Sequence, residues 1–140
     1  MKKKLAIAAA LLLIAAVGAY FCLPVRLVPE ENAGGLHVTY IESLHAAVQV
    51  DYLTEQYSLE PGTPEYDETL ELLQISRCRR TLGTLFGRDS ADGAQSTMTI
   101  TSGSGWMVML TDAGEVLVNG RAYRCQAKPL IYAILDLARE

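Results

Sequence analysis

The sequence is poor in the side chains on which catalysis and metal binding usually depend. Its 140 residues include only two histidines and three cysteines. His37 and His45 stand eight positions apart, which along one strand is about 26 Å and too far for a shared metal ion. Glu42 and His45 have the Glu-x-x-His spacing of helical di-iron sites, but the second copy that such sites need is missing. We therefore expect no catalytic residue, no metal site and no cofactor.

Two loops resemble known functional motifs without completing them. Residues 102–105 (Ser-Gly-Ser-Gly) lack the outer glycine of a Gly-x-Ser-x-Gly nucleophile motif and join two predicted strands, so we interpret them as a hairpin turn. Residues 89–93 lack the acidic spacing and the closing glutamate of a calcium-binding loop. We interpret that segment as a solvated turn.

Positive charge is scarce beyond the first 26 residues. The chain has 12 lysine and arginine residues against 16 aspartate and glutamate residues, a net charge of −4. Without the basic residues at positions 2, 3, 4 and 26, eight basic residues face sixteen acidic ones, and the net charge is −8. A domain with this charge repels phosphate groups, which argues against binding to nucleic acid. Solubility alone explains the acidic balance.

An apolar run, by contrast, dominates the N-terminus. Residues 5–25 carry no charge, follow three lysines and end at Arg26. A helix of about 20 residues crosses the core of a bilayer, and the lysines favour a cytoplasmic N-terminus with the rest of the chain outside. We therefore expect residues 1–28 to form a single-pass anchor in the cell membrane.

A cleaved signal peptide is the alternative interpretation of this segment. Residues 17–19 (Val-Gly-Ala) fit a cleavage site before Tyr20, and the exported domain would then be secreted. Against cleavage, the apolar run continues past this point, and Tyr20 and Phe21 suit a membrane interface. A lipidated Cys22 is disfavoured, because the residue before it is the bulky Phe21.

Residues 36–140 show the pattern of one α+β domain behind a spacer at residues 29–35, which holds two glycines and a proline. Alternating apolar and polar residues predict strands at 36–41, 46–59, 77–82, 97–101, 106–110, 115–118 and 121–125. Helices are predicted at 64–76 and from residue 129 onward, and a helix at 42–49 remains an alternative. We expect a mainly antiparallel sheet, ending in a β-meander and packed by one or two helices.

Two local signals fix the position of one helix and one turn. Thr63 is a favourable N-cap, and Pro64 suits the first helical position because its missing N–H loses no hydrogen bond there. Asn119 and Gly120 favour a type I′ hairpin turn, because both residues tolerate a positive φ.

Cys78 and Cys125 are the only cysteines beyond the apolar run, and each lies on a predicted strand. In an oxidising compartment they can form a disulfide if their Cα atoms come within about 7 Å. Two buried free thiols are the alternative.

Five arginines also lie on predicted strands that can be neighbours: Arg77, Arg79, Arg80, Arg121 and Arg124. Together they would form a patch for an anion or a protein partner. Pairing with acidic residues of the helix is the alternative, since surface ion pairs are common and individually weak.

Several segments together resemble a group of small exported proteins. They are the lysine-rich anchor, Pro-Gly-Thr-Pro-Glu-Tyr at 61–66, Arg-Arg-Thr-Leu at 79–82 and Asn-Gly-Arg-Ala-Tyr-Arg at 119–124. The chain is similar in these segments to N-terminally anchored exported proteins of Gram-positive anaerobic bacteria. The resemblance covers most of residues 59–125 and implies no activity, cofactor or catalytic residue.

These features favour a membrane-tethered binding or accessory domain that contacts another protein or a component of the cell envelope. A small inhibitor or immunity-type protein is an alternative, because a small acidic α+β domain is a suitable scaffold for one. A small hydrolase, with a histidine and a carboxylate that meet only in the folded chain, is a further alternative. A binding domain would need an exposed apolar patch, which we expect around Met107 and Met109.

Overall fold

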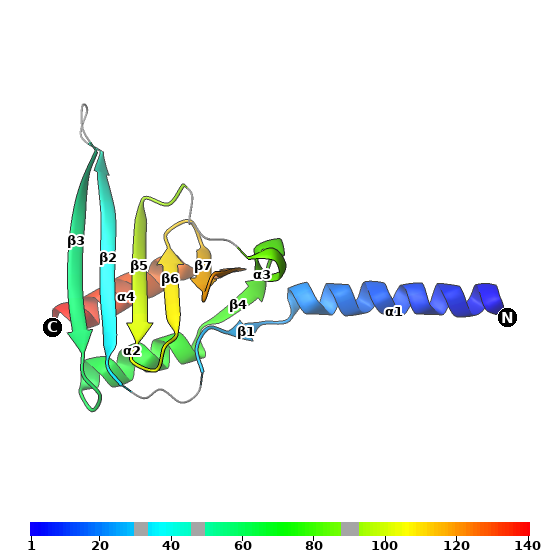
Figure 1. Cartoon of the computed structure of the whole chain (residues 1–140), viewed down its shortest axis with the longest axis horizontal. Coiled ribbons are helices and arrows are strands. Elements are labelled where there is room, and N and C mark those ends of the chain that lie inside the picture. Colours follow the sequence, from blue (N-terminus) through cyan, green and yellow to red (C-terminus); the bar gives the residue numbers. More distant parts are fainter. Residues whose placement is uncertain (30–33, 46–49, 88–92) are drawn as a thin grey trace.

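A computed structural model describes residues 1–29, 34–45, 50–87 and 93–140; the side chains of His45 and Val50 are outside this description. The chain forms an N-terminal apolar helix followed by an α+β domain, as the sequence predicts (Figure 1). The helices are α1 (Lys2–Cys22), α2 (Pro64–Ile75), α3 (Leu82–Phe86) and α4 (Ala127–Arg139). The strands are β1 (Val25–Arg26), β2 (Leu36–His45), β3 (Val50–Leu59), β4 (Arg77–Arg80), β5 (Ser96–Ser102), β6 (Met107–Thr111), β7 (Glu115–Val118) and β8 (Arg121–Arg124).

One antiparallel sheet of eight strands organises the domain. Its order is β1-β4-β8-β7-β6-β5-β2-β3, so β1 and β3 are the two edges. The predicted hairpin of β2 and β3 is present with a continuous register from Leu36 opposite Leu59 to His45 opposite Val50. The predicted meander is present as well, because β5, β6, β7 and β8 pair in sequence order.

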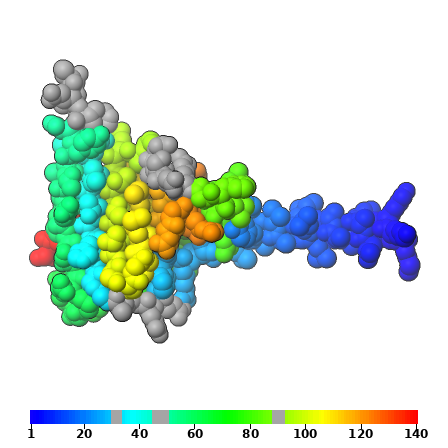
Figure 2. All heavy atoms as spheres, viewed as in Figure 1, coloured from blue at the N-terminus to red at the C-terminus, as the bar shows by residue number. Residues whose placement is uncertain are grey.

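The two long helices of the domain cover one face of this sheet, and the short helix α3 packs on β8 from the other face. α2 and α4 contact each other and lie behind the strands in Figure 1. The core between them and the sheet includes Val38, Ile100 and Val108 from the strands, Leu73 from α2 and Ile134 from α4, all buried. The sheet face turned toward the viewer in Figure 2 carries no long helix over β3, β2, β5 and β6.

The predicted helix start at Thr63 and the predicted turn at Asn119 are both confirmed. The Thr63 hydroxyl accepts a hydrogen bond from the backbone N–H of Tyr66 at 3.3 Å, and Pro64 is the first residue of α2. Asn119 and Gly120 have φ values of 48° and 80°, as a type I′ turn requires. α4, however, begins at Ala127, so Pro129 lies within its first turn and does not open it.

Three segments differ from the prediction. The alternative helix at 42–49 is wrong for residues 42–45, which continue β2, while residues 46–49 lie outside the described part. The predicted strand at 77–82 ends at Arg80, and α3 follows it. The apolar helix ends at Cys22, and Leu27 and Val28 are buried in the domain core. The globular fold therefore begins within the segment that hydropathy assigns to the anchor.

Candidate functional site

α1 is an apolar helix of 21 residues, long enough to cross a membrane, and none of its residues is buried. Arg80 attaches the end of this helix to the domain. Its guanidinium carbon lies 4.6 Å from the centre of the Tyr20 ring, and its Nη1 donates a hydrogen bond of 3.2 Å to the Tyr20 carbonyl. The pairing of β1 with β4 adds a second connection between the anchor and the sheet.

β3 forms the sheet edge that lies farthest from α1 (Figure 1). It is ten residues long and pairs only with β2. Natural edge strands are usually protected by shortness, lysine, proline, a bulge or a charged side chain that points inward. On β3, Glu55 points inward opposite the buried Tyr40, but its carboxylate is bound by Arg139 of α4. β3 contains no lysine and no proline, and its unbroken register with β2 leaves no place for a bulge. This edge is therefore open to backbone pairing with another strand.

The predicted apolar patch at Met107 and Met109 is only partly formed. Met107 is 39% exposed, and Met109 is half-buried on the uncovered face. The register places Thr101 and His37 across the sheet from Met107, and Thr99 across from Met109. Among the described residues around Met107 and Met109, hydroxyl and imidazole groups therefore interrupt the apolar surface.

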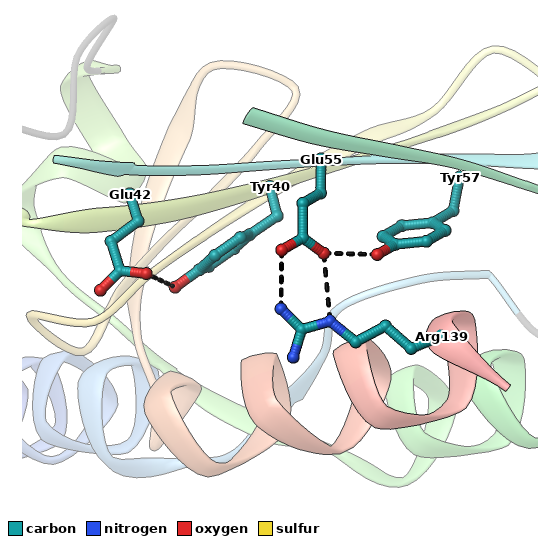
Figure 3. A network of polar contacts seen from close by, with 5 residues as sticks. All are labelled: Tyr40, Glu42, Glu55, Tyr57 and Arg139. Carbon is teal, nitrogen blue, oxygen red and sulfur yellow. Dashed lines mark hydrogen bonds and ion pairs between the residues drawn. The ribbon is translucent and has the colours of Figure 1, made fainter. Parts of the chain in front are cut away.

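A polar network joins the last turn of α4 to β3 (Figure 3). Arg139 donates two hydrogen bonds to the Glu55 carboxylate, from Nη2 at 2.7 Å and from Nε at 3.1 Å. The Tyr57 hydroxyl donates to the same carboxylate. The Arg139 hydrogen bonds, followed by that of Tyr57, lower the pKa of Glu55, and the hydrogen bond to Glu55 raises the pKa of Tyr57. The ionised Glu55 carboxylate accepts hydrogen bonds from both Arg139 and Tyr57. We call this contact, which joins α4 to the hairpin of β2 and β3, the clamp.

Tyr40 and Glu42 form a second pair in Figure 3, with the Tyr40 hydroxyl donating to Glu42 Oε2 at 3.2 Å. Burial is the main cause that raises the pKa of Tyr40, and Glu42 adds to it. Both residues point toward the helix layer from β2. The pair satisfies the hydroxyl of a buried tyrosine.

The structure brings the two predicted cysteines together. Arg79 lies opposite Arg124 in the pairing of β4 with β8, and extending that register by one residue places Cys78 opposite Cys125. Both are free thiols, Cys78 buried and Cys125 half-buried. The hydrogen bond between them lowers the pKa of the Cys125 thiol, while that bond and burial raise the pKa of Cys78. Cys125 is therefore the thiol that ionises first.

The five predicted arginines do not share one site. Arg77 donates to the carbonyls of Gln74 and Ser76 at 2.6 and 3.3 Å, and Arg121 donates to the Thr84 carbonyl at 3.3 Å. Arg80 is bound to Tyr20 as described above. Only Arg79 and Arg124 lie directly opposite each other on adjacent strands, both exposed. The acidic residue that the register places opposite one of them is Glu115 of β7, across from Arg124.

Of the two histidine side chains, the structure describes only that of His37. His37 is exposed, and its Nδ1 lies 3.1 Å from the Ser58 hydroxyl. Both histidines belong to β2, so their backbones are about 26 Å apart along that strand. The described residues include no group of three or more histidine, cysteine, aspartate and glutamate side chains that could hold a metal ion.

The remaining predicted loops have mixed outcomes. Ser102–Gly105 is a hairpin turn, with the Gly105 N–H donating to the Ser102 carbonyl at 2.9 Å. Residues 89–92 lie outside the described part.

Sequence reasoning missed both the free β3 edge and α3. The edge could not be found, because strand order depends on contacts between distant segments. α3 has a capping box, but Thr84 stands where the usual sequence signal has glutamate or glutamine, so the signal is weak. Comparisons with protein-family models, with curated proteins and with solved structures found no match to this chain.

Proposed function

We propose that the chain is a single-pass membrane protein whose domain lies outside the cytoplasm and binds an extended segment of a partner protein along β3. The observation that carries this proposal is the ten-residue edge of β3, which pairs only with β2 and has no lysine, proline or bulge. A strand added to such an edge gains main-chain hydrogen bonds for affinity, and alternate side chains give selectivity.

The position of this edge relative to α1 supports the proposal. β3 is seven strand spacings from β1, which is roughly 33 Å across the sheet. Strands β2, β3, β5 and β6 run across the direction of α1 in Figure 1, so a membrane-inserted α1 would leave β3 as the outermost strand. An incoming segment would then meet this edge without obstruction from the lipid.

A second copy of this chain is a poor occupant of the edge. Two copies that pair antiparallel through β3 are related by a two-fold axis perpendicular to the sheet. That rotation would turn the two α1 helices in opposite directions, since each extends away from β3 within the plane of Figure 1. The two anchors could not enter the same membrane, so we assign the edge to a different protein.

Photo-crosslinking in membranes of the native host tests the proposal. A photoreactive residue at Gln56, which is exposed on β3, should give one adduct of defined mass. The same probe at Glu68, exposed on α2, is the matched control and should give none. Adding Thr54→Lys to the Gln56 probe chain should abolish the adduct, because an edge lysine opposes strand addition. Equal adduct patterns from both probes, or an adduct that survives Thr54→Lys, would contradict the proposal.

A further inference from the structure

The short helix α3 shows the reverse of the burial expected for a helix on a water-facing surface. Its Thr84 is buried, while Leu82 is 66% exposed, Leu85 49% and Phe86 83%. A surface helix in water normally turns its apolar side chains toward the core and its polar ones outward. Three large exposed apolar side chains on one short element indicate a surface that meets something other than water.

Polar contacts hold α3 in this orientation. The hydroxyl groups of Thr81 and Thr84 both donate to the Ala122 carbonyl on β8, the first at 3.0 Å. The Thr81 backbone N–H donates to the Thr84 hydroxyl at 2.9 Å, which completes a capping box. A Cβ atom added at Gly83 would lie 2.7 Å from that of Ala122, so the helix is packed as closely on β8 as a glycine allows. The polar side of α3 therefore packs on the sheet, and its apolar side chains point outward.

The exposed side of α3 lies beside the end of α1. Leu85 lines a shallow groove together with Val17, Tyr20 and Phe21 of α1. At 1.5 Å per residue, the stretch from Leu5 to Cys22 spans about 26 Å, so a hydrocarbon core of about 30 Å ends near the last turn of α1. Figure 1 shows α3 at that end of α1, on the side of the domain nearest to it.

We propose that α3 is a second membrane contact of this chain, in which Leu82, Leu85 and Phe86 lie in the same bilayer interface at which α1 ends. The inference rests on the uncleaved anchor of the proposed function. Because Arg80 and β1 attach α1 to the sheet, insertion of α3 fixes the tilt of the domain on the bilayer. The domain then stands with β4 and β8 near the lipid and β3 away from it.

The charges around α3 suit a lipid surface. The exposed Arg124 shares a surface hollow with Leu82 and Glu115, which lies opposite it on β7, and Arg79 lies opposite Arg124 on β4. Guanidinium groups at this level can meet lipid phosphates while the apolar side chains enter the interface. Beside α3, the two arginines therefore outnumber the one carboxylate of Glu115, although the exported part as a whole is acidic.

Quenching of tryptophan fluorescence by brominated lipid tests this inference on the full chain. Phe86→Trp is reconstituted in phosphatidylcholine–phosphatidylglycerol vesicles with and without dibrominated acyl chains. The native Trp106 is buried in the domain core and provides the constant background. Tyr52→Trp is the matched control, because Tyr52 is 67% exposed on the distant strand β3. We expect bromine to remove most of the emission added by Phe86→Trp and none of that added by Tyr52→Trp.

Flotation of the same vesicles at alkaline pH separates the two ways in which this expectation can fail. If the chain floats with the vesicles and Phe86→Trp is quenched no more than Tyr52→Trp, α3 does not touch lipid and only the present inference is overturned. If the chain is released from the vesicles, α1 is no anchor, and both the proposed function and the contact of α3 are overturned.

Discussion

Cys78 and Cys125 lie within reach of a disulfide because their strands are neighbours. Directly opposed residues in antiparallel strands have Cα atoms about 4.5–5.5 Å apart, inside the range that a disulfide needs. Oxidation removes two protons and two electrons, which an extracytoplasmic thiol–disulfide oxidant would accept, with the Cys125 thiolate as the attacking group. The sequence identified the two candidates but could not show their proximity, which depends on the pairing of β4 with β8.

The first prediction concerns this pair. The chain isolated from cells and denatured without reductant should react with a thiol reagent only at Cys22. Reduction should then lower the free energy of unfolding by about 2–4 kcal/mol, because the bond restricts the unfolded chain. Cys125→Ser is the control, since reduction should leave its stability unchanged. Reaction of all three cysteines before reduction would show that no bond forms.

The second prediction concerns Glu55, whose pKa is lowered in the folded chain by Arg139 and Tyr57. The folded form then binds fewer protons than the unfolded form, so the stabilisation is present above the ordinary pKa of a glutamate and is lost as the pH falls through the lowered value. Glu55→Gln should flatten this acidic part of the stability profile, as measured by urea unfolding followed through Trp106 fluorescence.

A double-mutant cycle checks the assignment of that effect to one ion pair. Arg139→Gln alone should reduce the acidic dependence, and adding it to Glu55→Gln should change nothing further. A Glu55→Gln profile that matches the parent chain at every pH would contradict the clamp.

At the scale of elements, the features that depend on neighbouring residues were predicted correctly from the sequence. The N-cap of α2 and the Asn119–Gly120 turn were found because each depends on residues adjacent in the chain. β1 was missed because Val25 ends the apolar run, Arg26 closes it, and the two form a strand only by pairing with β4. α3 was missed because a helix of five residues with an internal glycine and threonine has little intrinsic preference for helix. Its stability comes from contacts with β8, which the sequence does not show.

The third prediction concerns the start of α2. Thr63→Ala removes the hydroxyl that accepts from the Tyr66 N–H and donates to the Glu60 carbonyl at 2.9 Å. The free energy of unfolding should fall by about 1 kcal/mol, as is typical for the loss of an N-cap. Thr63→Ser keeps the hydroxyl and should retain most of that energy. Equal unfolding midpoints for the two variants in urea would show that the cap contributes nothing.

The whole molecule separates its charges along the sheet. Five of the seven described basic residues beyond Arg26 lie on β4 and β8, on the side nearest to α1, while β3 on the far edge carries Asp51 and Glu55. The net charge of −8 predicted a domain that avoids anionic surfaces, but net charge does not describe how charges are placed. The proposed function depends on α1 remaining attached, because both the proposed contact of α3 with lipid and the proposed outward position of β3 require it.

The most direct test of this account, and its fourth prediction, is the location of the C-terminus. Two reporters are each fused after Glu140 in a bacterial host. Alkaline phosphatase is active only outside the cytoplasm. Green fluorescent protein becomes fluorescent in the cytoplasm but stays dark when it is exported unfolded across the membrane. Because Lys2, Lys3 and Lys4 should remain cytoplasmic, we expect an active phosphatase and a dark fluorescent fusion, with both full-length chains retained in membranes after alkaline extraction. A fluorescent fusion together with an inactive phosphatase would place the domain in the cytoplasm and contradict the account.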